Sequence, residues 1–288
     1  MTNESILVAK DTVNQQPAAS TGAGAQAKPP LVVIAGATAS GKTALALRLA
    51  GRFPIEIVNA DSRAFYRGMD IGTAKPSIEE RTRVPHHLVD ILDPDEPMTL
   101  SVFQQMAMDA IADIHGRNRL PVLVGGTPQY VNALVEGWGI PQVPPNPSLR
   151  LELEREAGRD GVAALHERLR LVDPHAAAKT GPNLRRIVRA LEVYLETGTP
   201  ISHLQTRHDV SFDPLELELW WPREVLYRRI DNRVDDQIAA GLVDEVRGLL
   251  DAGYEPTLPS FSSIGYRQLV PAISGEISLA AAVERIKV

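Results

Sequence analysis

The chain has 288 residues, of which 44% are hydrophobic, and a formal net charge of −6. This composition is typical of a globular protein, and the acidic balance argues against a surface coated with basic charge for nonspecific nucleic-acid binding. The absence of cysteine excludes disulfides, thiolate metal sites and cysteine nucleophiles. The apolar runs are too short for a membrane span and no secretory signal pattern is present, so we expect a cytoplasmic protein without a membrane partner.

Residues 1–30 are rich in Ala, Gln, Thr and Gly and poor in large apolar side chains. Such a segment buries too little surface to offset the entropy lost on ordering. We therefore predict a disordered tail that ends at Pro29-Pro30.

A phosphate-binding pattern, G-x-x-x-x-G-K-[ST], follows this tail without a mismatch. Its residues are Gly36, Ala37, Thr38, Ala39, Ser40, Gly41, Lys42 and Thr43. An apolar run of strand length, Leu31–Ala35, precedes it, and Thr43–Ala50 has the composition of a helix. Because strand, glycine loop and helix are the context that the motif requires, we expect the loop amides to bind a di- or triphosphate. Lys42 adds a positive charge, and Thr43 is the candidate magnesium ligand.

Two further strand ends carry polar groups. The strand Ile55–Ala60 is followed by Asp61, and the strand Leu120–Val124 is followed by Gly125-Gly126-Thr127. Since parallel α/β sheets place ligands at the carboxyl ends of their strands, we expect both groups beside the phosphate loop. The second strand lacks the acidic residue that a motor-type NTPase uses to hold magnesium. The alternative is that Asp61 and Thr127 only cap the helices that follow.

The pair His86-His87 resembles a metal-binding sequence only superficially. Adjacent residues point in different directions on a strand, and no third ligand stands nearby at a suitable spacing. We interpret these histidines as a hydrogen-bonded structural pair.

Pro141–Pro147 contains four prolines in seven positions. Because such a stretch forms a stiff linker, we predict a domain boundary there. Residues 148–207 have a helical, arginine-rich sequence in which Arg185, Arg186 and Arg189 lie close together. These arginines either form a solvated helix face or contact a phosphate backbone. We predict a core of 31–140 and 211–288 with a helical insertion at 141–210.

The chain returns to the core at Glu218–Trp221, and Pro222-Arg223 opens a long helix. Apolar residues every four positions from Leu226 to Leu250 drift around a true helix, which predicts a break at Gly241. Of the arginines in this segment, we expect Arg223 to lie in a cleft. Arg228, Arg229 and Arg233 are expected to face acidic ligands or water.

These features predict an α/β protein with a parallel sheet of the P-loop NTPase type and an inserted helical domain. An anion cradle, a carboxylate and a hydroxyl at neighbouring strand ends fit a kinase. They also fit any reaction in which a diphosphate departs. On spacing alone, a small-molecule kinase ranks slightly ahead.

From Leu31 onward the sequence resembles the tRNA dimethylallyltransferases. The match includes the phosphate loop, Asp61-Ser62-Arg63, the long run Tyr66–Pro76 and Gly125-Gly126-Thr127. The remaining matching motifs are Pro85-His86-His87-Leu88, Arg189-Ala190-Leu191-Glu192 and Ile264-Gly265-Tyr266.

The resemblance implies transfer of a dimethylallyl group from its diphosphate to the exocyclic amine of the adenosine just 3′ of a tRNA anticodon. It implies a P-loop core and helical insertion that grip the anticodon stem-loop, with no protein partner, and a base flipped into a channel. Gly36–Thr43 with Mg²⁺ on Thr43 would then stabilise the departing diphosphate, helped by Arg223. Asp61 would accept the amine proton, and Thr127 would orient the base or the leaving group.

The resemblance also implies a set of RNA contacts. They are Asp61, Ser62, Arg63, Ala64, Thr127, Arg185, Arg186, Ile187, Val188, Arg189, Ser262, Ser263, Ile264, Gly265, Tyr266 and Arg267. Three departures from the family pattern stand out: Pro128-Gln129 after Thr127, a shortened Asn183-Leu184 before the arginines, and an end at Val288 where the family continues into a basic helix. We expect a monomer.

Three alternatives remain beside this reading. A nucleoside or metabolite kinase would convert ATP to ADP. An enzyme that prenylates free adenine nucleotides would not need the insertion at 141–210. A non-catalytic RNA-binding protein would not need Lys42, Thr43 and Asp61.

Overall fold

The computed structural model describes residues 6–10 and 27–287, and the chain forms two compact units. One unit contains the described residues up to Val135 together with those from Ser211 onward. The other unit is Glu136–Val210. The insertion predicted at 141–210 lies inside this second range, and each unit is described by itself below.

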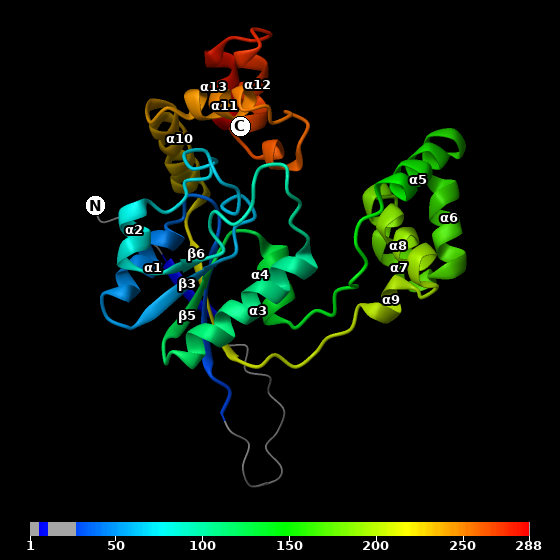
Figure 1. The fold of residues 1–288 in the computed structure, drawn as a ribbon, viewed down its shortest axis with the longest axis horizontal. Coiled ribbons are helices and arrows are strands. Elements are labelled where there is room, and N and C mark those ends of the chain that lie inside the picture. Colours follow the sequence, from blue (N-terminus) through cyan, green and yellow to red (C-terminus); the bar gives the residue numbers. More distant parts are fainter. Residues whose placement is uncertain (1–5, 11–26, 288) are drawn as a thin grey trace. The chain divides into compact units, whose positions relative to one another are not determined.

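A six-stranded sheet forms the centre of the first unit (Figure 1). Its order is β1 (Ile6–Lys10), β6 (Asp213–Trp220), β2 (Pro30–Gly36), β5 (Leu120–Val124), β3 (Ile55–Asn59) and β4 (His86–His87). The strands from β6 to β4 are parallel, which confirms the predicted α/β class, and β1 pairs antiparallel with β6. Val124 pairs with Ile34 of β2 and with Asn59 of β3, so these strands end at the same level. Their carboxyl ends therefore form one edge at which a ligand can bind.

The strand β1 corrects one prediction, because Ile6–Lys10 lie within the segment 1–30 that we expected to be disordered. These residues pair with Glu216–Trp220 of β6 in a continuous register. An edge strand offers unpaired backbone groups to any short apolar run that can reach it, and composition alone does not reveal that opportunity. The rest of this predicted tail up to residue 26 lies outside the described residues.

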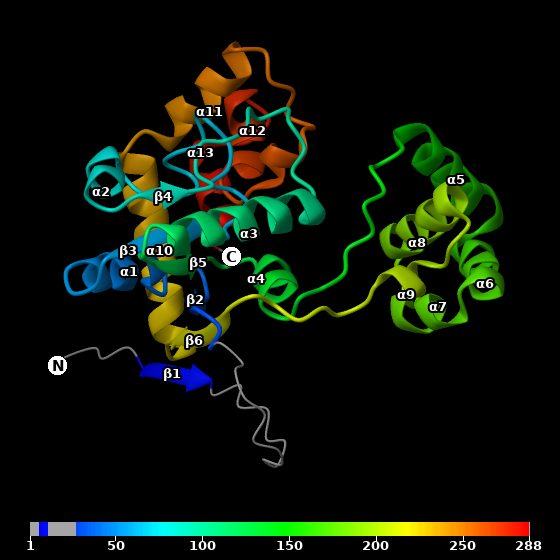
Figure 2. The same ribbon diagram turned by 60° about the horizontal axis from the view of Figure 1, so that its bottom comes forward.

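Helices cover both faces of the sheet (Figure 1). Val32 and Ile34 of β2 pack in one apolar cluster with Ala46 and Leu47 of α1 (Lys42–Ala50). Because side chains alternate along a strand, Leu31 and Val33 face the opposite side. In Figure 1 that side is covered by α3 (Leu100–Gly116) and α4 (Pro128–Val135), which contact the sheet. The short α2 (Ile78–Arg83) lies near α1 in both views (Figures 1 and 2).

A second apolar cluster lies under the C-terminal helices. These helices are α10 (Arg223–Ala239), α11 (Leu242–Asp251), α12 (Tyr266–Ile273) and α13 (Leu279–Lys287), with a 3₁₀ turn at Pro259–Ser262. The predicted helix break is confirmed: Gly241 has φ 100°, a conformation that glycine adopts without strain, and it separates α10 from α11. Met69 packs into the same cluster, which ties the loop after β3 to these helices.

The second unit consists of helices, as its sequence predicts. They are α5 (Pro147–Asp160), α6 (Val162–Val172), α7 (Pro174–Thr180), α8 (Leu184–Thr197) and α9 (Ile201–Leu204). Asn146, Asp173 and Asn183 each accept a backbone hydrogen bond at a helix start, which explains where α5, α7 and α8 begin. The core includes Leu153, Leu165 and Leu191. Within the described part of the chain, no helix is long and apolar enough to cross a membrane.

Candidate active site

The phosphate loop connects β2 to α1 and is shaped by its own lysine. Lys42 Nζ donates hydrogen bonds to the carbonyl oxygens of Gly36 at 3.0 Å and Ala37 at 2.9 Å. Gly36 has φ 145°, and a Cβ there would lie 2.8 Å from the carbonyl oxygen of Leu219, so only glycine fits. Burial lowers the pKa of Lys42, and the charge of Asp61 opposes that shift. The lysine is thus a partly desolvated cation that faces a carboxylate.

Side chains that follow β6 hold the outer half of the same loop. Arg229 Nε donates to the carbonyl oxygen of Ala39 at 2.7 Å, and Trp221 Nε1 donates to that of Ser40 at 2.9 Å. The guanidinium of Arg229 also lies 4.7 Å from the centre of the Trp221 ring. Ala39 has φ 62°, which is unfavourable for alanine, and these contacts offset that strain. The loop is therefore held from both sides.

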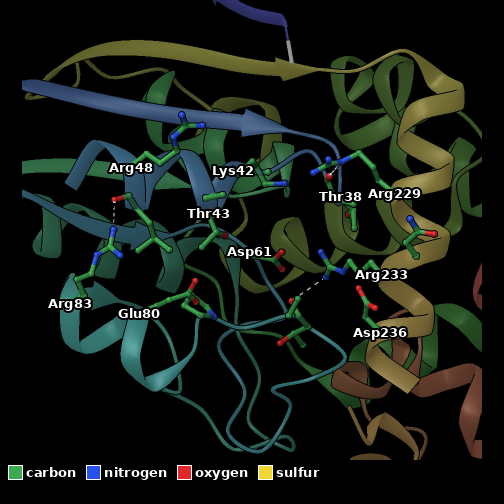
Figure 3. Close-up of a pocket in the computed structure, with 18 residues that line it drawn as sticks. Thr38, Lys42, Thr43, Arg48, Asp61, Glu80, Arg83, Arg229, Arg233 and Asp236 are labelled. Atoms are coloured by element: carbon green, nitrogen blue, oxygen red, sulfur yellow. Dashed lines mark hydrogen bonds between the residues drawn. The ribbon is translucent and has the colours of Figure 1, made fainter. Parts of the chain in front are cut away.

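A cavity of about 780 Å³ opens at the phosphate loop, and Figure 3 shows the side chains around it. Its wall includes the loop residues Thr38, Lys42 and Thr43, then Asp61 after β3, and Arg233 on α10. The Asp61 charge raises the pKa of both Lys42 and Arg233 against the lowering that burial causes. An anion in this cavity would meet two partly desolvated cations.

Two hydrogen bonds fix the position of Asp61 after β3. Asn59 Oδ1 accepts from the Asp61 amide at 3.0 Å, and Asp61 Oδ1 accepts from the Arg63 amide at 2.9 Å. No helix follows Asp61 directly, so its carboxylate does not serve as the helix cap considered above. Within residues 27–287, no hydrogen bond to Asp61 Oδ2 is found, which leaves that oxygen available to a ligand.

A second cavity, of about 500 Å³, also has Asp61 in its wall. Ser62, Arg63 and Thr127 line it together with apolar side chains of α10, among them Ile230 and Val234. The two cavities share Thr38, Asp61, Thr73 and Arg233 in their walls. Asp61 therefore lies in the wall of both cavities, of which the second is the more apolar.

Thr127 lies beside Asp61 as the strand-end argument predicts. Its Oγ1 accepts from the Ser62 amide at 3.3 Å and lies 3.4 Å from Ser62 Oγ. The first glycine of Gly125-Gly126 allows this approach, because a Cβ on Gly125 would lie 2.3 Å from the carbonyl oxygen of Ala60. A Cβ on Gly126 would point toward Lys42 Nζ at 3.4 Å. The Gly125-Gly126 pair thus lets two strand ends and the lysine converge.

The structure does not bring Arg223 into this site. Its Nε donates to the Tyr227 hydroxyl at 2.5 Å, its guanidinium lies over that ring, and the residue is exposed. Among the described residues that line the two cavities, the arginines of α10 are Arg229 and Arg233 instead. Sequence reasoning missed them because it favoured the residue at the helix start. The spacing of four residues between Arg229 and Arg233, which places them on one helix face, was the available signal.

The predicted RNA contacts of the first unit divide by exposure. Ser62, Arg63, Ser262 and Ile264 line the second cavity, and Arg63 donates to Ser262 Oγ at 3.1 Å. Ser262, Ile264 and Arg267 are exposed and Ser62 and Arg63 are half-buried, so all five can be reached by RNA.

Four further residues of that predicted set are buried: Ala64, Ser263, Gly265 and Tyr266, of which Ser263 also lines the second cavity. Tyr266 is 0% exposed and packs in the C-terminal cluster. Their contact with a polynucleotide stays a prediction, and their burial shapes the loops that carry their exposed neighbours.

The helical unit shows the same division. Arg185 and Arg186 are exposed on α8. Ile187 and Val188 are buried in the core of the unit, which excludes them as side-chain contacts to RNA. Arg189 is occupied internally, because it donates to Glu192 Oε2 at 2.6 Å and to the carbonyl oxygen of Val143 at 3.0 Å.

The two histidines are indeed held by hydrogen bonds. His87 Nε2 lies 2.7 Å from Glu56 Oε2, and His86 Nδ1 lies 2.7 Å from the carbonyl oxygen of Val84. In the described part of the chain, no group of three or more His, Cys, Asp or Glu side chains is placed to hold a metal. Two buried polar atoms there lack a hydrogen-bond partner, His86 Nε2 and Ser40 Oγ of the phosphate loop.

Comparison with known proteins places these features in a family. The profile of the family described as IPP transferase matches residues 64–288. The tRNA dimethylallyltransferase of Chloroflexus aurantiacus is 55% identical over 258 residues, which cover 89% of this chain and 87% of that protein. The tRNA dimethylallyltransferase of Thermomicrobium roseum is 53% identical over 259 residues, which cover 90% and 79%.

Two solved structures are similar as well. The crystal structure of a tRNA isopentenylpyrophosphate transferase from Bacillus halodurans is 41% identical, with a TM-score of 0.63, and the match covers 90% of this chain and 82% of that one. A eukaryotic dimethylallyltransferase acting on tRNA is 30% identical, with a TM-score of 0.75 over 90% of this chain and 66% of that one. With the phosphate loop, Asp61 and Thr127 assembled at one sheet edge, the chain belongs to the tRNA dimethylallyltransferase family.

Proposed function

We propose that this chain transfers a dimethylallyl group from dimethylallyl diphosphate to the exocyclic amine of the adenosine 3′-adjacent to the anticodon in tRNA, and that it does so in the cytoplasm. The observation that carries the proposal is the position of Asp61 on the wall shared by the two cavities. The phosphate-loop cavity suits the diphosphate, and the more apolar cavity suits a flipped adenine. Family membership supports this assignment of substrates.

The phosphate loop stabilises the diphosphate that leaves during the reaction. Negative charge grows on the leaving diphosphate as its bond to the allylic carbon breaks, and groups already aimed at that charge lower the barrier. The amides of Gly36–Thr43 and the ammonium of Lys42 supply such groups. Arg233 takes the role of second cation that the sequence assigned to Arg223, because it lines both cavities.

The residues present fit a magnesium ion that arrives with the diphosphate. Thr43, whose hydroxyl is a suitable oxygen ligand, lines the cavity beside Lys42 and Asp61. Mg²⁺ is commonly held by one or two protein oxygens, with phosphate oxygens and waters completing its coordination. Thr43 would be the protein ligand, and the bound ion would supply charge stabilisation of the leaving group.

Asp61 and Thr127 act on the adenine that receives the dimethylallyl group. As the N–C bond forms, the C–O bond to the diphosphate breaks and the amine loses one proton, which Asp61 accepts. A positioned proton acceptor is worth about 10²–10⁴-fold in rate. Thr127 Oγ1, held by the Ser62 amide, orients the base beside it. Half-buried Arg63 and exposed Arg185, Arg186 and Arg267 are the proposed contacts to the RNA backbone.

Incubation of the purified chain with labelled dimethylallyl diphosphate and bulk tRNA tests the proposal. We expect label to become attached to RNA and diphosphate to be released. A parallel incubation with ATP should produce no ADP. Formation of ADP without labelled RNA would instead favour a kinase.

A further inference from the structure

The carboxylate of Glu245, on α11, accepts hydrogen bonds from three backbone amides of Asp70–Gly72, a loop that is distant in the sequence. Its Oε2 accepts from the amides of Asp70 at 2.8 Å and Ile71 at 2.7 Å, and its Oε1 accepts from that of Gly72 at 3.1 Å. Three consecutive amides directed at one anion form a nest, an arrangement that proteins use elsewhere to bind phosphate. Here a carboxylate of the chain itself fills the nest, and hydrogen bonds to an ionised acceptor are about twice as strong as neutral ones.

Tyr266 donates a fourth hydrogen bond to the Glu245 carboxylate. Its hydroxyl donates to Glu245 Oε1 at 2.5 Å. Burial and the negative charge of Glu245 raise the pKa of Tyr266, so the hydroxyl stays protonated and remains a donor. The ring leaves no room for a side chain at position 72, since a Cβ on Gly72 would lie 2.4 Å from it. Tyr266 and Glu245 therefore specify the path of the loop together.

The carbonyl groups of the same loop are bound by α10. Gln237 Nε2 donates to the carbonyl oxygens of Ile71 at 2.7 Å and Gly72 at 3.0 Å. The next residue, Thr73, lines both cavities, and its carbonyl oxygen accepts from Arg233 at 3.4 Å. Fixing the loop therefore fixes Thr73 and one of the contacts of Arg233.

We propose that Glu245 is a positioning residue: it holds Asp70–Gly72 so that Thr73 and Arg233 present a preformed wall to the diphosphate. This inference rests on the proposed function in that it takes the phosphate-loop cavity as the diphosphate site. It assigns to the Tyr66–Pro76 run a purpose other than contact with RNA. Glu245 binds the loop away from Thr73, the residue that lines the cavities. A charged residue in this position keeps Thr73 in place while a highly charged substrate binds and leaves.

The substitution Glu245→Gln tests the inference without a large change in volume. The amide group presents N–H donors where the nest needs an acceptor, so at least one loop amide or the Tyr266 hydroxyl loses its partner. We expect the affinity for inorganic diphosphate, measured by calorimetry with Mg²⁺, to fall about tenfold. We also expect KM for dimethylallyl diphosphate to rise by a similar factor, while KM for tRNA stays within about twofold of the parent value.

Asp244→Asn is the matched control. Asp244 precedes Glu245 on α11 but is exposed and pairs with Arg247 on the surface, so the same loss of charge should leave diphosphate affinity unchanged. Glu245→Asp keeps the charge and should recover part of the affinity. Hydrogen exchange followed by mass spectrometry should show faster exchange of the 70–72 amides in Glu245→Gln, with the strands of the sheet unaffected.

Unchanged diphosphate affinity in Glu245→Gln would overturn the inference. So would an equal rise of both KM values with faster exchange throughout the unit, which would show a general structural role. Diphosphate binding is measured without tRNA or transfer. A parent chain that binds diphosphate but transfers nothing would therefore contradict the proposed function and leave this test in force.

Discussion

One pair of arginines in the helical unit and one arginine in the unit that contains the sheet serve different purposes. In the helical unit, Arg150 and Arg189 bind Glu192, a carboxylate whose side chain is 0% exposed, at 2.7 and 2.6 Å. In the unit that contains the sheet, the guanidinium of Arg233 is partly desolvated, but no carboxylate of the described chain binds it as Glu192 binds Arg150 and Arg189. Within residues 27–287 it forms no ion pair shorter than 4.0 Å, and its hydrogen bond to Thr73 measures 3.4 Å.

This difference separates charges that stabilise the fold from charges that await a ligand. Asp61 raises the pKa of Arg233 without forming an ion pair with it, so the desolvation of this arginine is only partly offset within the chain. An anionic ligand would offset the rest. A charge that already has its partner within the chain contributes to stability and has little left to offer a substrate. The comparison therefore predicts that substitutions of charges without a partner change activity, and that substitutions of charges with a partner change the free energy of unfolding.

Asp61→Asn should have the largest effect. Asparagine keeps the shape and can still accept the Arg63 amide, but it cannot take up a proton. We expect the rate of transfer at saturating substrates to fall by about 10²–10⁴-fold, while the affinity for tRNA changes little. Single-turnover transfer and equilibrium tRNA binding measure the two quantities.

Asp236→Asn is the control for this prediction, because Asp236 lines the phosphate-loop cavity and is absent from the described wall of the second cavity. It should reduce the rate far less than Asp61→Asn. Parallel loss of tRNA binding and transfer in Asp61→Asn would show that Asp61 supports structure and would contradict its proposed role as proton acceptor.

The helical unit should respond to acid through Glu192. Desolvation alone would raise the pKa of this carboxyl, but hydrogen bonds from Arg150, the Asn146 amide and Arg189 lower it to about 2, from an ordinary value of 4.5. Because the pKa of the folded state is the lower one, the stabilisation is complete above pH 4.5 and is lost as the pH falls from 4.5 toward 2. The full shift corresponds to about 3 kcal/mol, and solvent screening of the half-exposed arginines reduces it to about 2 kcal/mol.

Urea unfolding of the parent chain followed by helical circular dichroism at pH 6 and pH 3 should reveal this loss, which Glu192→Gln should largely remove. Glu167→Gln is the matched control, since Glu167 pairs with Arg170 at an exposed position three residues away. It should leave the pH dependence as it is. An equal response of both variants would mean that Glu192 is not the group responsible.

Arg233→Gln and Arg223→Gln provide a direct test between the arginine that faces the cavities and the one that the sequence favoured. Loss of a hydrogen bond between charged groups weakens binding by about tenfold, which is the decrease we expect in diphosphate affinity for Arg233→Gln. Arg223→Gln should change it less, because Arg223 is bound to Tyr227 at the surface. A larger effect of Arg223→Gln, measured by calorimetry, would restore the assignment made from the sequence.

The fold class, the phosphate loop and the positions of Asp61 and Thr127 after their strands could be predicted from the sequence, because each depends on local spacing. A glycine motif between a strand and a helix has one common structure, and polar residues directly after parallel strands meet at one edge. The break at Gly241 also follows from a local pattern, the drift of a four-residue repeat around a helix.

What the sequence did not reveal depends on partners far away in the chain. The state of Arg189 is set by Glu192, which also binds Arg150, 42 residues from Glu192. The choice between Arg223 and Arg233 depends on how α10 lies against the phosphate loop. The strand β1 exists because β6 offers an open edge about two hundred residues away.

Arg185, Arg186 and Arg189 finally provide the mildest test of the comparison, within one helix. The exposed Arg185 and Arg186 are free to neutralise RNA phosphates, and each contact contributes about 0.9 to the slope of log affinity for tRNA against log salt. The double substitution of Arg185 and Arg186 by Gln should therefore weaken tRNA binding several-fold and lower that slope by about 2. Arg189→Gln should leave the slope unchanged and lower the urea midpoint, because its guanidinium is held by Glu192 and Val143. If Arg189→Gln lowered the slope instead, an arginine with a partner inside the fold would still be available to RNA, and the distinction between the two kinds of charge would not hold.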